Sequence, residues 1–162
     1  MTDLPTYSII RSFAAPRAAV WRVWTTPALL AAWYGPGVET IIHKYDLRAG
    51  GVWLNEMKWG DKSDRSRMDF QTVTPQEKLV WHHGSTDENW ALAPSRMMPD
   101  WPQQFLTEVS FSDEGNATSV TLTQTPMNAS AAEIACFTKM MGGMDKGWGS
   151  GFNIIDELLA KA

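Results

Sequence analysis

The chain has 162 residues, of which 44% are hydrophobic and 20% are charged, and its formal net charge is -4. This composition excludes a disordered chain, and the acidic balance makes nucleic acid an unexpected partner. The length suits one domain with its own core, so we expect residues 1–162 to form a single domain. Cys136 is the only cysteine, which excludes an internal disulfide bond.

The beginning of the chain gives no sign of a targeting segment. Met1–Pro5 lacks the basic and apolar regions of a signal peptide, and no apolar run in the chain is long enough to span a bilayer. We therefore expect a cytoplasmic protein without a membrane span.

The first predicted elements are one strand followed by two short helices. Tyr7–Ala14 has the composition of a strand. Pro16 suits the start of a helix, and the amphipathic turns that follow it are interrupted at Pro27. A second short helix then extends to the turn at Gly35–Gly37.

Six further strands are predicted after this turn, and most are joined by short polar turns. Consecutive strands with short connections favour an antiparallel meander, so the whole sheet should hold six or seven strands. The predicted strands are Glu39–Leu47, Val52–Trp59, Arg67–Thr74, Lys78–Ser85, Gln104–Ser112 and Thr118–Thr125.

One connection in the meander is long. Residues Thr86–Pro102 have no regular pattern but carry large apolar side chains, namely Trp90, Met97, Met98 and Trp101. Loops of this length are uncommon and often functional, so we expect this one to fold back over a cavity or to form an interaction patch.

The last stretch, Ser130–Ala162, predicts a long helix. Large apolar residues recur every three or four positions from Ile134 to Leu159, and Ser130 with Glu133 forms a capping box. Such a helix would extend roughly 45 Å and would need a sheet to cover it. Five glycines between positions 142 and 151 allow a break, but the apolar period continues through them. We therefore expect a continuous or bent helix with room left beside the sheet.

Several motifs occur in the order found in one protein family. They are Phe13–Trp21, Trp24–Pro36, Asp46–Trp53, Thr74–Trp81 and Gly147–Trp148. Together they resemble the SRPBCC/START-like domains of the activator of heat-shock-protein ATPase homologue group, from about Tyr7 to Leu159. The resemblance implies an α+β helix-grip fold, like that of the birch-pollen allergen, with a pocket for an apolar small molecule. Two departures are the absence of a glycine near Met68 and the length of the Thr86–Pro102 loop.

The sequence gives little support for a metal, a cofactor or a nucleophile. His82 and His83 are neighbours in a strand and point to opposite faces, so they cannot bind one ion together. No cysteine and histidine cluster is present, and Cys136 has no basic neighbour closer than Lys139. We expect neither a metal nor a cofactor, with His43 and the other histidines as ordinary polar residues.

Alternation along the strands gives the predicted ligand site. If Trp53 and Trp81 face the long helix, parity places polar side chains on the same apolar wall. Convergent polar groups in an aromatic wall are typical of a ligand site, although they can also bond to one another. Arg67 and Asp69 share one strand face, either outside or at the pocket's charged end. The predicted ligand-binding residues are Trp53, Asn55, Met57, Trp81, His83, Gln124, Met141, Met144, Trp148 and Phe152.

Three functions remain open at this stage. The function that we expect is a carrier or sensor of a small apolar molecule, which needs only a cavity between the sheet and the long helix; an enzyme or an adaptor is the alternative. A cyclase, dehydratase or hydrolase also needs an acid or base inside it, for which His83 is the candidate. An adaptor for a chaperone needs an exposed patch, and a homodimer is a further possible assembly.

Overall fold

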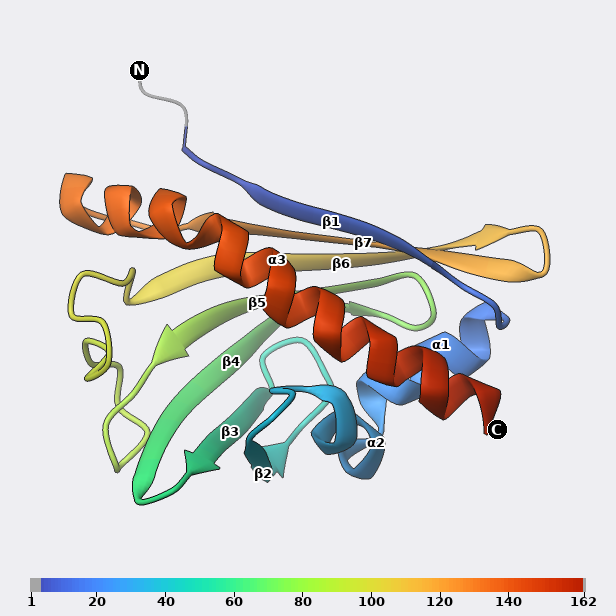
Figure 1. The fold of residues 1–162 in the computed structure, drawn as a ribbon, viewed down its shortest axis with the longest axis horizontal. Helices are drawn as coiled ribbons and strands as arrows, with labels where there is room; N and C mark the ends of the chain where they lie inside the picture. Colours follow the sequence, from blue (N-terminus) through green and yellow to red (C-terminus); the bar gives the residue numbers. More distant parts are fainter. Residues whose placement is uncertain (1–3, 162) are drawn as a thin grey trace.

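The computed structural model describes residues 4–161 and has the predicted α+β architecture. Seven strands form one sheet, a long helix lies across it, and two short helices follow the first strand (Figure 1). The predicted helix-grip fold is confirmed. The elements are β1 (Tyr7–Phe13), α1 (Arg17–Thr25), α2 (Pro27–Trp33), β2 (Glu39–Tyr45), β3 (Val52–Trp59), β4 (Lys62–Thr74), β5 (Lys78–Ser85), β6 (Gln104–Glu114), β7 (Ala117–Pro126) and α3 (Ala131–Ala160).

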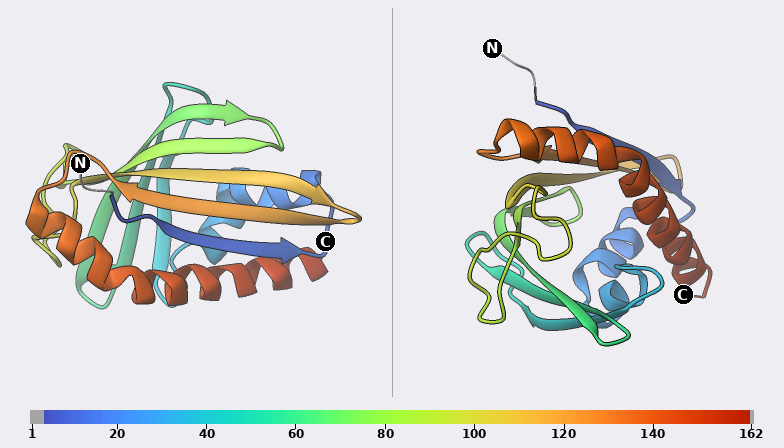
Figure 2. Two further views of the ribbon diagram at one scale, coloured as in Figure 1. Left: turned by 90° about the horizontal axis from the view of Figure 1, so that it is seen from above. Right: turned by 60° about the vertical axis from the view of Figure 1, so that its left-hand side comes forward.

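The order of strands explains how the sheet surrounds the helices. The order is β1-β7-β6-β5-β4-β3-β2, and all neighbours are antiparallel. The sheet curls so that its two ends are turned toward each other (Figure 2). Helix α3 contacts β1 and β7 at one end of the sheet, together with α1 and α2. The middle strands therefore curve away from α3, and the space between them must be filled by something else.

Strand β4 begins five residues earlier than predicted, whereas β6 and β7 exceed their predicted bounds by only one or two residues at an end. The sequence pattern places the start of β4 at Arg67, but the strand begins at Lys62, and the turn before it is the pair Gly60–Asp61. The residues at its start are polar, which is typical of a turn. They belong to the strand because they pair with β3 across the sheet, with Arg65 directly opposite Glu56.

Helix α3 runs without interruption for 30 residues and passes through all five glycines. Its start is fixed by Ser130, whose hydroxyl accepts from the backbone of Glu133 while the Glu133 carboxylate accepts from the backbone of Ser130. The helix changes direction about its middle (Figure 2). No helix within residues 4–161 is long and apolar enough to cross a membrane.

The densest part of the core lies where α1, α2 and the second half of α3 meet the sheet. Trp24 is in contact with the rings of Trp33, Phe111 and Phe152. Phe152 also meets Phe13 of β1 edge to face, at 5.5 Å between ring centroids. The largest fully buried side chains are Trp24, Trp33, Trp53, Trp81, Phe13, Phe70, Phe137, Phe152, Leu30, Met68, Leu79 and Leu122.

Candidate functional site

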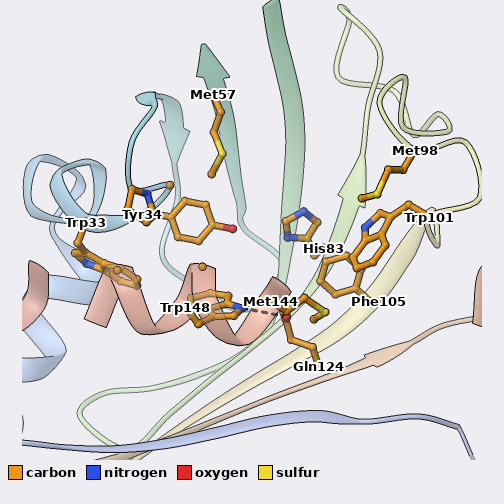
Figure 3. A pocket seen from close by; sticks show the side chains of 14 residues that line it. Trp33, Tyr34, Met57, His83, Met98, Trp101, Phe105, Gln124, Met144 and Trp148 are labelled. Atoms are coloured by element: carbon orange, nitrogen blue, oxygen red, sulfur yellow. Dashed lines mark hydrogen bonds between the residues drawn. The ribbon is translucent and has the colours of Figure 1, made fainter. Parts of the chain in front are cut away.

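A pocket of about 390 Å³ lies beside this core, between α3 and the inner face of the sheet. The turn after α2 and the loop before β6 complete its walls (Figure 3). None of the lining residues is an aspartate, glutamate, lysine or arginine. They are Trp33, Tyr34, Gly35, Pro36, Met57, His83, Met98, Trp101, Phe105, Gln124, Met144, Gly147, Trp148 and Gly151.

Four strands contribute one side chain each to the sheet side of the pocket: Met57 from β3, His83 from β5, Phe105 from β6 and Gln124 from β7. His83 and Phe105 are directly opposite in the β5–β6 register, and their rings stack at 4.4 Å between centroids. Strand alternation alone places these residues on the inner face.

Helix α3 forms the opposite wall through residues of a single face. Met144, Gly147, Trp148 and Gly151 follow one another at intervals of three, one and three positions, so their side chains or backbone face the same way. The Trp148 indole Nε1–H donates to Gln124 Oε1 at 3.2 Å, and Gln124 Nε2–H donates to Thr107 Oγ1 at 3.2 Å. This chain of hydrogen bonds fixes the Gln124 amide and joins the helix to the sheet.

The turn after α2 supplies a third wall. Trp33 is held by a hydrogen bond from its Nε1–H to the Val23 carbonyl oxygen, at 2.8 Å. Gly35 has φ of +75°, and a Cβ there would lie 2.8 Å from Met57 Cε. Only glycine combines this backbone conformation with so close an approach, which brings the turn against β3. The Tyr34 hydroxyl points into the space on the side of His83 (Figure 3).

The loop before β6 covers the remaining side with Met98 and Trp101. The Trp101 ring stacks on Phe137 of α3 at 5.5 Å and meets Phe105 edge to face at 5.8 Å. The end of the loop is fixed to the start of α3, because the Gln103 backbone N–H donates to Glu133 Oε2 at 3.2 Å. This segment is part of the loop expected to fold back over a cavity.

Burial favours the neutral form of both ionisable groups of the pocket. Desolvation lowers the pKa of His83 to about 4. Part of the imidazole borders the pocket, but its Nδ1 is buried and has no hydrogen-bond partner among residues 4–161. Desolvation also raises the pKa of Tyr34, with a smaller contribution from the negative charge of Asp64. The pocket therefore presents polar atoms without any formal charge.

The structure brings half of the predicted site residues to the pocket. Met57, His83, Gln124, Met144 and Trp148 line it. Their part in ligand binding stays a prediction.

The other five predicted residues lie beside the pocket rather than on it. Trp53 and Trp81 are fully buried and contact each other, and Tyr34 covers Trp53 at 4.8 Å. Asn55 is buried, and its Oδ1 accepts from the Trp53 indole. Phe152 belongs to the dense core, and Met141 is partly buried against it.

Other polar candidates lie away from the pocket. Arg67 and Asp69 form a bidentate ion pair on the outer face of β4, with N to O distances of 2.8 and 3.1 Å. His43 bonds to Glu56 at 2.9 Å, also outside the pocket. Across residues 4–161, no group of three or more His, Cys, Asp or Glu side chains is arranged to hold a metal ion.

Several lining residues are not among those predicted from the sequence. Phe105 could have been found, because it shares strand parity with Val109, which the pattern places on the inner face. Tyr34, Gly35 and Pro36 belong to a turn and carry no periodic signal. Their position depends on where α2 ends, which only the fold determines.

Comparison with known proteins gives a family and a fold. The model of the family described as "Activator of Hsp90 ATPase homolog 1-like protein" matches residues 14–160. No curated protein matches the chain.

Solved structures of bacterial proteins share the architecture. A Mycobacterium smegmatis protein is 25% identical with a TM-score of 0.79, covering 98% of this chain and 96% of the other. An Arthrobacter aurescens protein is 23% identical with a TM-score of 0.80, at 97% and 87% coverage. A Nitrosomonas europaea protein is 23% identical with a TM-score of 0.72, at 96% and 94% coverage. The last two likenesses show the fold alone.

Proposed function

The chain belongs to the Activator of Hsp90 ATPase homolog 1-like family, and from this premise we propose that it binds a small apolar molecule, as a carrier or sensor. The observation that carries the proposal is the character of the pocket. Its space of about 390 Å³ is walled by aromatic rings and three methionines, without a charged side chain. Pockets of this size with a few placed polar groups are typical of small-molecule sites.

The polar atoms of the pocket support orientation of a ligand rather than charge recognition. Gln124 is held by Trp148 and Thr107, which use two of the four hydrogen bonds that its side-chain amide can make. An ion entering the pocket would lose its hydration without meeting an opposite charge, which is costly. The part of a ligand that enters the pocket should therefore be uncharged.

A catalytic role is less well supported by the same geometry. His83 is the candidate acid or base, but its pKa of about 4 makes it a weak base at neutral pH. Its Nδ1 is buried and has no hydrogen-bond partner among residues 4–161, so no neighbouring group holds the ring in a defined protonation state. Binding is thus the function that these residues support best.

An adaptor role is a second candidate because of one surface feature. Leu92 and Met97 of the loop before β6 are 44% and 50% exposed, so this loop presents two large apolar side chains to solvent. A chaperone or a second copy of the chain could cover them. The family description is compatible with such a role.

The proposal is tested with N-phenyl-1-naphthylamine, an uncharged fluorophore that brightens in apolar surroundings. We expect the native protein to bind it at one site per chain. Met98→Arg places a charge at the pocket wall and should weaken binding about tenfold or more, whereas Met97→Arg alters an exposed neighbour and should have little effect.

Two results would contradict the proposal. One is the absence of binding to the native protein, which would favour the adaptor role. The other is equal binding by the two arginine variants, which would place the probe on the loop surface instead of in the pocket.

A further inference from the structure

The five glycines of α3 are not all explained by the same structural requirement. Glycine is a poor helix former, so five of them in one helix need an explanation. Gly142, Gly143 and Gly149 do not line the pocket, whereas Gly147 and Gly151 do. The last two are four positions apart and therefore lie on one face of the helix, one turn from each other.

Close packing explains Gly151. It is buried, and a Cβ there would lie 3.0 Å from the Trp33 carbonyl oxygen and 3.2 Å from the Trp33 ring. The absence of a side chain lets α3 approach the end of α2. This contact closes the pocket at the end next to the core.

No packing contact explains Gly147. A Cβ at this position would have no atom within 4 Å, so a side chain would fit without a clash. Gly147 is nevertheless part of the pocket lining, and it is exposed to solvent. A residue that both lines the pocket and faces water marks the place where the pocket opens past the helix.

We propose that Gly147 is the specificity-determining residue of the pocket: its missing side chain leaves a passage through which one end of an elongated, amphiphilic ligand reaches solvent. This inference rests on the proposed binding function and names the ligand class. The apolar body lies against the aromatic walls. The polar end stays in water, because the pocket holds no charge to pair with it.

The passage is tested with two probes of different shape. N-phenyl-1-naphthylamine is compact and fits inside the pocket, whereas 11-(dansylamino)undecanoic acid is a long amphiphile with a carboxylate at one end. In Gly147→Leu the affinity for the long amphiphile should fall about tenfold or more, while the affinity for the compact probe changes less than about threefold. Gly147→Ala should show a smaller loss of the same kind.

A matched control comes from the same helix. Gly142 is exposed and does not line the pocket, and a Cβ at this position would have no atom within 4 Å. Gly142→Leu should therefore leave the affinity for both probes unchanged. Both leucine variants replace glycine with a better helix former, so both should fold, and thermal unfolding checks this.

The outcomes separate this inference from the proposed function. Failure of the native protein to bind either probe overturns both. Binding of both probes with equal loss in Gly147→Leu, or with no loss, overturns the passage alone and leaves the pocket as a binding site.

Discussion

The interior of the fold has two ends, and both are enclosed by the sheet and by α3. One end, the solid end, is filled by packed side chains, whereas the other, the hollow end, contains the pocket. At the solid end, α1 and α2 fill the curve of the sheet, and Trp24, Trp33 and Phe152 pack ring against ring. At the hollow end no helix enters the curve, and Met98 and Trp101 of a loop cover it from outside. The pocket occupies the space that remains.

This difference shows that the pocket is set by the short helices more than by the sheet. The inner face of the sheet carries large apolar side chains at both ends, from Leu79 and Phe111 at one end to Phe105 at the other. Where α2 ends, Tyr34 marks the boundary: its ring contacts Trp53 on the core side and also lines the pocket. Beyond Tyr34, side chains on the inner face of the sheet border the pocket instead of packing against another side chain.

The largest expected effect comes from removing a ring at the solid end. Phe152→Ala should lower the free energy of unfolding by about 3–5 kcal/mol, because the side chain is fully buried among aromatic rings. Met144→Ala, at the hollow end of the same helix, should cost less than about 1 kcal/mol, since Met144 already borders space. Urea unfolding measures both, and similar losses would mean that the two ends are packed alike.

The second expected effect is a pH dependence that arises at the hollow end. His83 is neutral in the fold, with a pKa lowered from 6.5 to about 4, while the unfolded chain takes up a proton near pH 6.5. The unfolded chain therefore binds one proton more than the folded protein between these pH values. The free energy of unfolding is at its full value above pH 6.5 and decreases as the pH falls toward 4, by up to about 3 kcal/mol. Met68 and Phe105 flank His83 in the neighbouring strands, and no charged group lines the pocket.

His83→Leu provides the control for this effect. The variant should lack the loss between pH 6.5 and 4 and should be about as stable as the native protein at pH 7, because Nδ1 has no partner within residues 4–161 to lose. The free energy of unfolding is measured across this pH range. An unchanged pH profile in His83→Leu would show that other groups cause the dependence.

The third effect compares two glycines that lie one turn apart at the boundary. Gly151→Ala should destabilise the fold by about 1–2 kcal/mol, because the new methyl group would press on the Trp33 backbone. Gly147→Ala should stabilise it by up to about 1 kcal/mol, since alanine favours the helix and meets no atom. Thermal unfolding distinguishes a loss of stability from a gain. If both variants changed the stability in the same direction, the proposed difference in packing between the two ends would be contradicted.

The smallest effect concerns the start of α3, at the hollow end. Ser130→Ala should cost about 1 kcal/mol, because it removes the acceptor for the Glu133 backbone N–H. Phe137 is the one buried residue of α3 before Gly151, so this end of the helix depends more on its cap than the second half does. Hydrogen exchange should show faster exchange near Glu133 but not near Phe152, and a uniform change along α3 would contradict this view.

The sequence predicts the fold well because its patterns act over short distances. Alternation places Trp53, His83 and Gln124 on one face, and the capping box locates Ser130 at the start of α3. The early start of β4 is not predicted, because its polar residues gain their partners only across the sheet, as Arg65 does with Glu56.

The site could be predicted only in part. Strand alternation identifies the side chains on the inner face of the sheet, but it does not show which of them are covered by other side chains and which border the pocket. Trp81 and His83 share the inner face of β5, but Trp81 is covered by core rings while His83 borders the pocket. The same is true on α3, where Phe152 and Trp148 are one turn apart. Distinguishing them requires knowing where the end of α2 meets α3, which is at the contact of Gly151 with Trp33.

The loop before β6 is fastened at two separate places, and this has an evolutionary consequence. Near its start, Trp90 lies under the Arg65 guanidinium at 4.7 Å, and its carbonyl oxygen accepts from Arg67. Near its end, Gln103 is held by Glu133. Insertions or deletions in the loop between these two anchoring contacts should be tolerated without displacing a strand, because the entropy of loop closure changes slowly with loop length. A lineage could therefore exchange the Met98 and Trp101 wall for another and acquire a new ligand while inheriting the same scaffold.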